Sequence, residues 1–332
     1  MISPAVQSIL DQNHFELVRI LRYGPRFICL KVRSGDRVGM FKMALPVAER
    51  SPQLAPPGYT WTEHEEILIL EQRLLKEALF LQFFSQQLGG AGFEPQVIAL
   101  SDTSPVWSLR TYIAEQPLTV DNSDFRFDQR FFELVTPRQA VDFFRKLHEL
   151  SDRLPQSLTD LIMPYTSALT NPMRFERSLS RAEAMPQFKS QAAHLGRRFQ
   201  ELVPEYDNYR RVITQYEPYS CHLFVVNGKI GLIDWENVGW GHALQDLSVL
   251  WMRCFEQPDW QADYLEVLRE YGYFGGNGQL FWDSELLIQS FANHQYFKTT
   301  DHIGTPEYDA AALTFFEHTI ERILGHSPYF KA

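Results

Sequence analysis

The sequence predicts an α+β fold in which a small antiparallel sheet is followed by a larger, mainly helical region. Three observations predict it. β-type residues form short runs near the start of the chain, apolar residues recur at helical spacing through most of the second half, and one Asn-Gly dipeptide separates two short apolar runs. The chain has 332 residues, enough for one two-lobed domain or two ordinary ones.

The first part of the chain predicts a helix and then a β-meander. Residues 2–12 have the pattern of a short amphipathic helix, which Ser3 could cap with Pro4 at its first position. Three strands are expected after it, over Phe15–Leu21, Phe27–Arg33 and Arg37–Leu45.

A long helix and two further strands complete this region. Residues 45–62 carry four prolines and a glycine, which predicts a loop or insertion. Apolar residues at helical spacing predict a helix over Glu63–Leu88, with Thr62 as its cap. Val97–Ala99 and Trp107–Ala114 predict the fourth and fifth strands of a five-stranded sheet.

The rest of the chain is predicted to be mainly helical. Its apolar residues follow the i, i+3, i+4 pattern of helices that bury one face. Helices are expected over Pro137–Leu150, Gln187–Leu202, Pro258–Tyr271, Gln279–Phe297 and Thr305–Leu324, the last ending before Gly325.

A hairpin interrupts the helical region and carries the strongest chemical signal. Leu223–Val226 and Lys229–Ile233 are apolar runs joined by Asn227-Gly228, a dipeptide typical of a two-residue hairpin turn. Asp234 leaves the second strand, where an acid can hold a metal or a substrate. The segment that follows, with Trp235, Gly239, Trp240 and Gly241, is rich in glycine and predicts irregular structure.

This hairpin, which ends in Ile-Asp-Trp-Glu and is followed by Gly-Trp-Gly and Asp246-Leu247, resembles the aminoglycoside phosphotransferase and choline kinase family. The family has a protein kinase-like fold, so the resemblance implies a small lobe over residues 1–115 and a larger lobe over 116–332. It also implies that Asp234 holds Mg²⁺ against the phosphates of ATP.

The resemblance implies a lysine and glutamate pair in the small lobe. Lys42, in Val-Gly-Met-Phe-Lys, stands where the family has the lysine that binds the α- and β-phosphates. Glu77 is the expected partner, with Glu71 as the second choice. The alternative is a lysine on the solvent face of an edge strand and exposed helical glutamates.

Two further nucleotide contacts are implied by the resemblance. The turn that contains Gly24 would cover the phosphates, although one glycine is a weak phosphate-binding signal. Residues 112–117 stand where the family has its hinge, so backbone groups of Tyr112 and Ala114 would bind adenine.

The chain departs from the family at the catalytic loop. The family has His-Gly-Asp followed by an Asn, whereas this chain has Gln215, Tyr216, Glu217 and His222 at those places. The resemblance implies that Glu217 is the catalytic base and that His222 joins Asp234 at the metal. Because imidazole suits transition metals better than Mg²⁺, both Mg²⁺ and Mn²⁺ are candidate ions.

Composition limits the partners. The formal net charge of −10 disfavours nucleic acid and suits cationic small molecules. Five acidic residues could form a cation-binding wall or simply a solvated face: Glu256, Asp259, Asp263, Glu266 and Glu270. The three scattered cysteines, together with the lack of a leader or an apolar run of bilayer length, predict a cytoplasmic protein without a membrane partner.

Three functions follow from these residues. The first is an ATP-dependent phosphotransferase that acts on a hydroxyl group of a small molecule. The second is a pseudokinase, a nucleotide-binding or regulatory module without phosphoryl transfer. In the third, Glu217, His222 and Asp234 only pack and cap the hairpin, and the chain has no nucleotide pocket.

Overall fold

The computed structural model describes residues 2–23, 26–45, 63–87, 95–114, 117–120, 125–162, 171–300 and 303–331. The chain divides into two compact units. The first comprises Met1–Gln116 together with the short segments Gln156–Leu161 and Ile233–Asn237, and the second comprises the rest of the chain. Asp234 therefore belongs to the same unit as the N-terminal sheet, although it lies far from that sheet in sequence.

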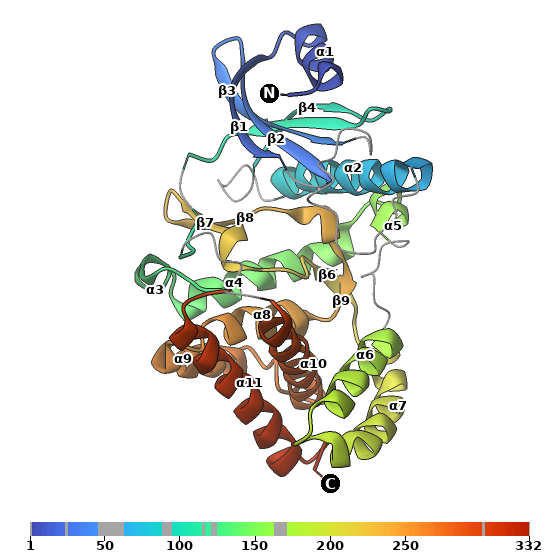
Figure 1. The fold of residues 1–332 in the computed structure, drawn as a ribbon, viewed down its shortest axis with the longest axis vertical. Helices are drawn as coiled ribbons and strands as arrows, with labels where there is room; N and C mark the ends of the chain where they lie inside the picture. Colours follow the sequence, from blue (N-terminus) through green and yellow to red (C-terminus); the bar gives the residue numbers. More distant parts are fainter. Residues whose placement is uncertain are drawn as a thin grey trace. The chain divides into compact units, whose positions relative to one another are not determined.

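The first unit is built on the predicted five-stranded antiparallel sheet (Figure 1). The strand order is β1-β2-β3-β5-β4, so the first three strands form the expected meander and β5 pairs with β3. The strands are β1 (Glu16–Tyr23), β2 (Phe27–Ser34), β3 (Arg37–Ala44), β4 (Val97–Ser101) and β5 (Trp107–Thr111).

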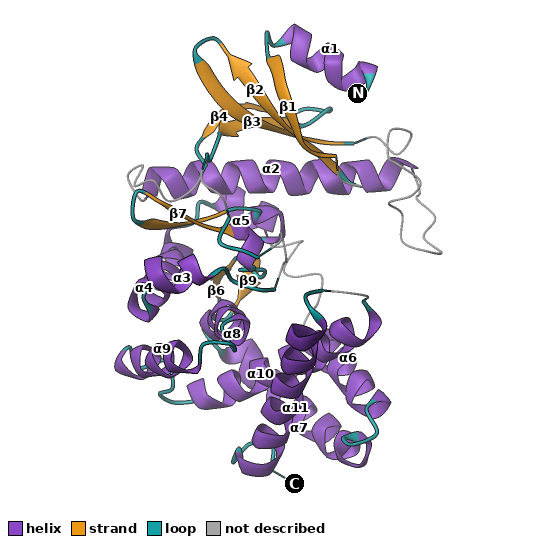
Figure 2. Ribbon diagram, turned by 60° about the vertical axis from the view of Figure 1, so that its left-hand side comes forward, coloured by secondary structure: helices purple, strands orange, loops and turns teal. Residues whose placement is uncertain are grey.

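Two helices pack on this sheet. The first, α1 (Pro4–Gln12), is capped by the Ser3 side chain as predicted and joins an apolar core with residues of β2, β3 and β5, among them Phe41 and Met43. The second, α2 (Glu63–Gln87), contacts β3, β4 and β5 (Figure 2). Because side chains alternate along a strand, Lys42 points away from the face that carries Phe41 and Met43 and towards α2.

The second unit is mainly helical, with α10 in contact with α6, α8 and α11, and α4 in contact with α8 and α9. The predicted start of α4 is confirmed, because Thr136 and Gln139 form a capping box around Pro137. The helices are α3 (Gln129–Leu134), α4 (Pro137–Glu149), α5 (Gln156–Ile162), which spans the division between the units, α6 (Asn171–Ala184), α7 (Ala192–Asn208), α8 (Ala243–Arg253), α9 (Pro258–Glu270), α10 (Gly278–Thr299) and α11 (Pro306–His326).

Several helix boundaries differ from the prediction, and two of the differences involve a proline or a glycine. The helix predicted over Gln187–Leu202 begins only at Ala192, after a short 3-10 turn, and continues through Pro204. The last helix begins after the Thr305 cap as expected, but it includes Gly325 instead of ending before it.

The predicted hairpin is present as β7 (Leu223–Val226) and β8 (Lys229–Leu232). Asn227 and Gly228 have φ angles of 51° and 73°, the left-handed values that this tight turn requires. The prediction of irregular structure over Gly239–Gly241 was wrong, because this segment is a strand, β9, which pairs with β6 (Val212–Thr214). A Cβ at Gly241 would lie 2.8 Å from Thr214, which explains the glycine.

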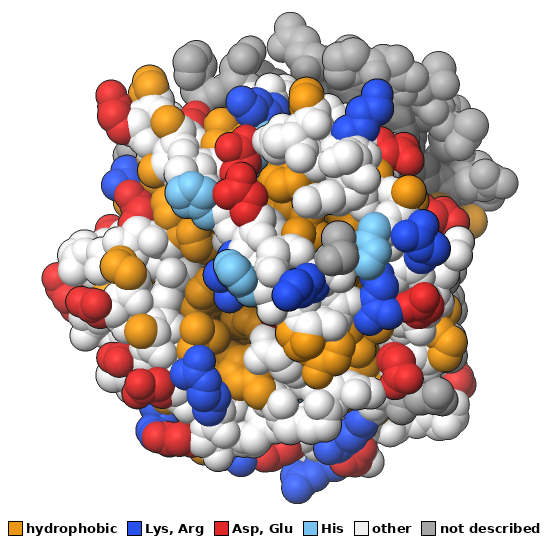
Figure 3. Space-filling view, turned by 90° about the horizontal axis from the view of Figure 1, so that it is seen from below, with side chains coloured by type: hydrophobic (Ala, Val, Ile, Leu, Met, Phe, Trp, Pro, Cys, Tyr) orange, Lys and Arg blue, Asp and Glu red, His pale blue; other side chains and the backbone are white. Residues whose placement is uncertain are grey.

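No helix in the described part of the chain is both long enough and apolar enough to cross a bilayer. Figure 3 shows one face of the molecule, on which acidic and basic side chains are interspersed among hydrophobic ones. Two members of the proposed acidic wall lie in ion pairs, Glu256 with Arg126 and Glu270 with Arg138. These two carboxylates are therefore already neutralised by arginines of the same unit.

Candidate active site

Lys42 lies at the centre of a cluster of carboxylates in the first unit. Its Nζ is 2.9 Å from Glu77 Oε2, 3.2 Å from Asp234 Oδ1 and 3.5 Å from Glu236 Oε2. Lys42 is only 7% exposed, so the alternative of a lysine on the solvent face is wrong. Burial opposes the positive charge, but Asp234 and Glu77 outweigh it and raise the pKa of Lys42 above its usual value.

Glu77 holds this cluster together from α2. It is fully buried, and while one carboxylate oxygen accepts from Lys42, the other accepts from Arg110 Nη1 at 2.7 Å and from the backbone N–H of Trp235 at 3.1 Å. Burial alone would raise the pKa of the Glu77 carboxyl, but Arg110 and Lys42 hold this pKa well below its usual range. Glu77 is therefore ionised across the physiological pH range.

The packing of Trp235, the next residue in the chain, fixes the position of Asp234 in the cluster. Trp235 is fully buried, and its ring lies 5.0 Å from that of Phe80 and 5.3 Å from that of Phe84, both on α2. Asp234 has a φ of 64°, a left-handed conformation that Asp tolerates better than most residues. Such conformations are concentrated at functional sites, where surrounding contacts compensate for their strain.

The second choice for the lysine partner, Glu71, has a different role. Its Oε1 accepts from Ser104 Oγ at 3.0 Å and from the backbone N–H of Val106 at 3.1 Å. It thus fixes the segment that leads into β5. Of the two glutamates, Glu77 is the one that pairs with Lys42.

The predicted catalytic loop lies in the second unit, and hydrogen bonds to Asp246 of α8 fix its backbone. The two oxygens of this buried carboxylate accept from the backbone N–H groups of Gln215 and Tyr216, each at 2.8 Å. The Gln215 side chain in turn accepts from the backbone N–H of Glu217 at 2.8 Å. Tyr216, at the place of the family glycine, has a φ of 77°. The loop therefore keeps a glycine-type backbone despite its changed residues.

His222 also contacts this loop. Its Nδ1 lies 3.0 Å from the carbonyl oxygen of Glu217, and because a carbonyl only accepts, Nδ1 must carry the proton. The ring also stacks on Tyr219, with centroids 5.6 Å apart. His222 thus links the two ends of the loop.

The remaining predicted residues are less informative. Gly24 lies outside the described residues. Tyr112 and Ala114 follow β5 without regular structure, and Lys31 Nζ lies 4.1 Å above the Tyr112 ring. Asp234 and His222 belong to different units. Within the described ranges, no three His, Cys, Asp or Glu side chains are grouped in a way that could hold a metal ion.

Sequence reasoning missed two residues of the cluster, Arg110 and Glu236. Arg110 is two residues after Ser108 on β5, so the two side chains share a face, and Arg110 Nε donates to Ser108 Oγ. Glu236 is part of Ile-Asp-Trp-Glu, but no pattern in the sequence assigns it a role. The strand period could have placed Arg110 on the face towards Glu77, whereas the contact of Glu236 with Lys42 depends on the fold.

A second buried carboxylate, Glu285 of α10, organises the second unit. It accepts two hydrogen bonds from Arg174 of α6, at 2.7 and 2.5 Å, and lies 2.8 Å from His242 Nε2. Burial alone would raise its pKa, but Arg174 and His242 together lower the pKa of Glu285 to about 2. The Arg174–Glu285 pair therefore connects α6 to α10 as a fully formed ion pair.

We expect this pair to make the protein acid-labile. A depressed folded-state pKa stabilises the fold above the unfolded-state pKa of about 4.3, and this stabilisation is lost as the pH falls towards 2. Between pH 5 and pH 2.5 the wild type should lose about 2 kcal/mol of unfolding free energy through this group. Glu285→Gln cannot titrate, so its urea-unfolding free energy should change less over the same interval. Equal changes in both proteins would contradict this role of Glu285.

The sequence of this chain matches the model of one protein family. The model of the phosphotransferase enzyme family (APH) matches residues 65–280, which is more than half of the chain. No sequence match was found among curated proteins.

Solved structures of similar fold cover almost the whole chain. A macrolide 2'-phosphotransferase from Brachybacterium faecium is 16% identical with a TM-score of 0.53, covering 93% of this chain and 96% of its own. The ADP-bound aminoglycoside phosphotransferase APH(2'')-Ib is 11% identical with a TM-score of 0.56 and full coverage of both chains. A choline/ethanolamine kinase family protein from Mesorhizobium loti is 15% identical with a TM-score of 0.53, covering 97% and 92%. These similarities show the predicted kinase-like, two-lobed α+β fold.

Proposed function

Because the chain belongs to the phosphotransferase enzyme family, we propose that it transfers the γ-phosphoryl group of ATP to a hydroxyl group of a small molecule. The observation that carries the proposal is the Lys42, Glu77 and Asp234 cluster. A buried, charged lysine is costly unless carboxylates compensate for its charge, as Glu77 and Asp234 do here, and an ammonium held in this way can bind phosphate oxygens. The ADP in one relative of similar fold supports an adenine nucleotide.

In this proposal Lys42 binds the phosphates and Glu77 orients it. Glu77 is itself held by Arg110 and by the Trp235 backbone, so it cannot swing away when Lys42 moves towards a nucleotide. The two anchors come from β5 and from the segment after β8. Because Glu77 contacts both Lys42 and the backbone of Trp235, the residue after Asp234, the position of the phosphate-binding lysine depends on the position of Asp234.

Asp234 and Glu236 are the oxygen donors that we propose for Mg²⁺ or Mn²⁺. Their side chains are 27% and 14% exposed, and burial raises the pKa of the Glu236 carboxyl, as expected of a crowded carboxylate with too little compensating charge. Mg²⁺ is usually held by one or two carboxylates together with substrate phosphates, so this donor set fits the ion. When bound, the ion would neutralise charge on the phosphates.

The proposed chemistry uses Glu217 as the base. The acceptor hydroxyl oxygen bonds to the γ-phosphorus, the bond from that phosphorus to the bridging oxygen breaks, and the hydroxyl proton passes to the Glu217 carboxylate while ADP leaves. The fixed loop supports this assignment, because Asp246 and His222 hold the backbone on both sides of Glu217. These hydrogen bonds matter because a general base must be held in a fixed position relative to the hydroxyl group that it deprotonates.

A pseudokinase is the second candidate, and His222 is the observation that favours it. Its Nδ1 donates to the Glu217 carbonyl, so this ring serves as a structural link at the place where the family has a metal ligand. Loss of that ligand would weaken catalysis and leave nucleotide binding by the first unit intact.

Nucleotide binding is tested by thermal unfolding with ATP or GTP, each with Mg²⁺, Mn²⁺ or EDTA. A nucleotide at one hundred times its Kd should stabilise the protein by about 2.7 kcal/mol and raise the melting temperature by several degrees. Asp234→Ala should remove the metal dependence of this shift, and Glu236→Gln should weaken it. If no nucleotide changes the melting temperature at millimolar concentration, both the enzyme and the nucleotide-binding pseudokinase are rejected.

A further inference from the structure

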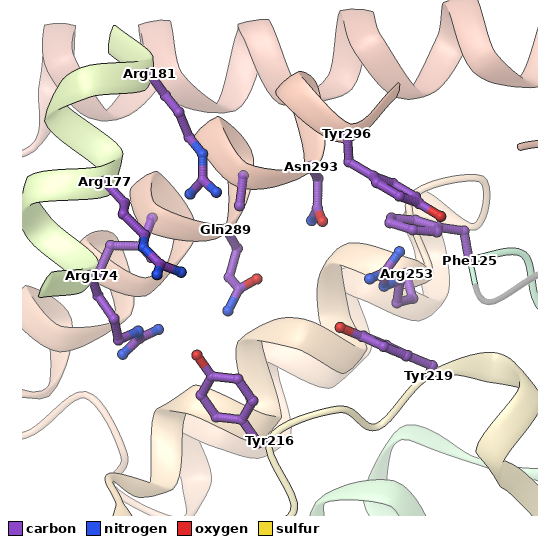
Figure 4. A pocket seen from close by; sticks show the side chains of 12 residues that line it. Phe125, Arg174, Arg177, Arg181, Tyr216, Tyr219, Arg253, Gln289, Asn293 and Tyr296 are labelled. Atoms are coloured by element: carbon purple, nitrogen blue, oxygen red, sulfur yellow. The ribbon is translucent and has the colours of Figure 1, made fainter. Parts of the chain in front are cut away.

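The second unit contains a pocket of about 360 Å³ beside the predicted catalytic loop. Figure 4 shows three arginine side chains of α6 on one side of the pocket, and Arg253 beside Tyr219 on the other side. Arg174, Arg177 and Arg181 come from α6, Arg253 from the end of α8, and Tyr216 and Tyr219 from the loop. The volume is in the range of small-molecule sites.

The arginines converge because of helical spacing. Residues 174, 177 and 181 are three and four apart, so their side chains lie along one face of α6. Arg253 is 6% exposed, and its guanidinium lies 3.2 Å from the ring centroid of Phe125 and 4.7 Å from that of Tyr219. The pocket thus combines a row of cations with aromatic walls.

The arginines of α6 differ in the partners that hold them. Arg174 is neutralised by Glu285, whereas Arg181 donates to the neutral side chain of Gln295 at 2.6 Å. Burial and the neighbouring Arg177 both lower the pKa of Arg181, which shows that its positive charge is poorly compensated. Among the described lining residues there is no Asp or Glu. This is unusual in a chain whose formal net charge is −10.

We propose that this pocket binds an anionic small molecule, a phosphomonoester or carboxylate of a polyhydroxy compound, through Arg177 and Arg181 of α6. Guanidinium groups match the geometry of both anions, and the aromatic walls suit the apolar faces of a sugar ring. Tyr216 directly precedes Glu217, so the pocket wall and the proposed base belong to one loop. That the bound anion is the phosphoryl acceptor rests on the proposed function, whereas its binding does not.

An anionic ligand differs from the cationic acceptor that the sequence suggested. The overall acidic charge indicated cations, but the pocket beside the loop has the opposite sign. Two of the five acidic residues considered for a cation-binding wall are already paired with arginines.

The test compares four related probes by isothermal titration calorimetry with the full chain: glucose, glucosamine, glucose 6-phosphate and gluconate. The two anions should bind at millimolar or lower concentration and more tightly than the neutral and cationic sugars, and added salt should weaken them. Arg177→Ala and Arg181→Ala should each lower the affinity for the anions by roughly ten- to a hundredfold. The matched control is Arg197→Ala, an exposed arginine on α7 outside this pocket, which should change nothing.

Lys42→Met separates this site from a nucleotide site in the first unit, because it should leave anion binding intact. Failure of both anions to bind, binding of glucosamine as tight as that of glucose 6-phosphate, or unchanged affinity in Arg177→Ala and Arg181→Ala would overturn the inference. Nucleotide binding without anion binding rejects this inference alone. Anion binding without any nucleotide binding rejects the proposed phosphotransferase and leaves the anion site standing.

Discussion

Replacing Glu217 with glutamine should lower phosphoryl transfer by about 10²- to 10⁴-fold, the usual contribution of a general base. Glutamine keeps the size of the side chain but cannot accept the hydroxyl proton. The affinity for ATP should hardly change, because the Lys42 cluster belongs to the other unit. Turnover is measured as ADP formation and affinity by calorimetry, so that the chemical step is separated from binding.

Glu217→Asp is the matched control, since it restores the acid of the family at this position. Asp and Glu differ by only about 0.4 in reference pKa, so the proton chemistry is retained and only the reach of the carboxylate changes. Glu217→Asp should therefore keep clearly more activity than Glu217→Gln. If Glu217→Gln keeps the turnover of the wild type, Glu217 is not the base.

Replacing Glu77 with alanine should have the largest effect on the first unit. The change leaves Arg110 and Lys42, which are 2% and 7% exposed, without their shared carboxylate. Breaking a buried ion pair on one side costs about 3–5 kcal/mol of unfolding free energy. Stabilisation by ATP should also be lost, because Lys42 is then held only by Asp234 and Glu236. Urea unfolding with and without ATP measures both effects.

Glu71→Gln is the control for this experiment. Glu71 lies on the same helix and is similarly buried, but it contacts Ser104 and the Val106 backbone. Its loss should lower stability moderately and leave the ATP-dependent increase in stability unchanged. An ATP response that survives in Glu77→Ala, or that disappears in Glu71→Gln, would argue against a specific role of Glu77.

Much of the first unit could be predicted because its signals are local. The strand runs, the capped first helix and the long apolar period of α2 each specify their structure within a few residues. The ion pair between Lys42 and Glu77 joins residues 35 apart and could be expected only from the resemblance to a family. Its extension to Arg110 and Glu236 depends on how the strands and α2 pack, which no short pattern specifies.

The features that the sequence did not predict also depend on contacts between segments far apart in the chain. β6 and β9 have three residues each, too few for a periodic signal, and the close approach of Thr214 that explains Gly241 exists only in the folded chain. The arginines of α6 could be seen to share a face, but the sequence did not show that Tyr216 and Arg253 lie opposite them. Net charge describes the whole chain and does not specify the charge of one pocket, whose described lining residues include four arginines and no Asp or Glu.

The most direct test of the central claim, that a phosphotransferase operates with this altered loop, is ATP turnover by the wild type, Glu217→Gln and His222→Asn, each with Mg²⁺ and with Mn²⁺. We expect measurable turnover by the wild type, nearly complete loss in Glu217→Gln, and a shift of metal preference towards Mg²⁺ in His222→Asn, because the amide supplies an oxygen donor. Equal background rates in all three proteins with both metals would contradict a phosphotransferase and leave the pseudokinase.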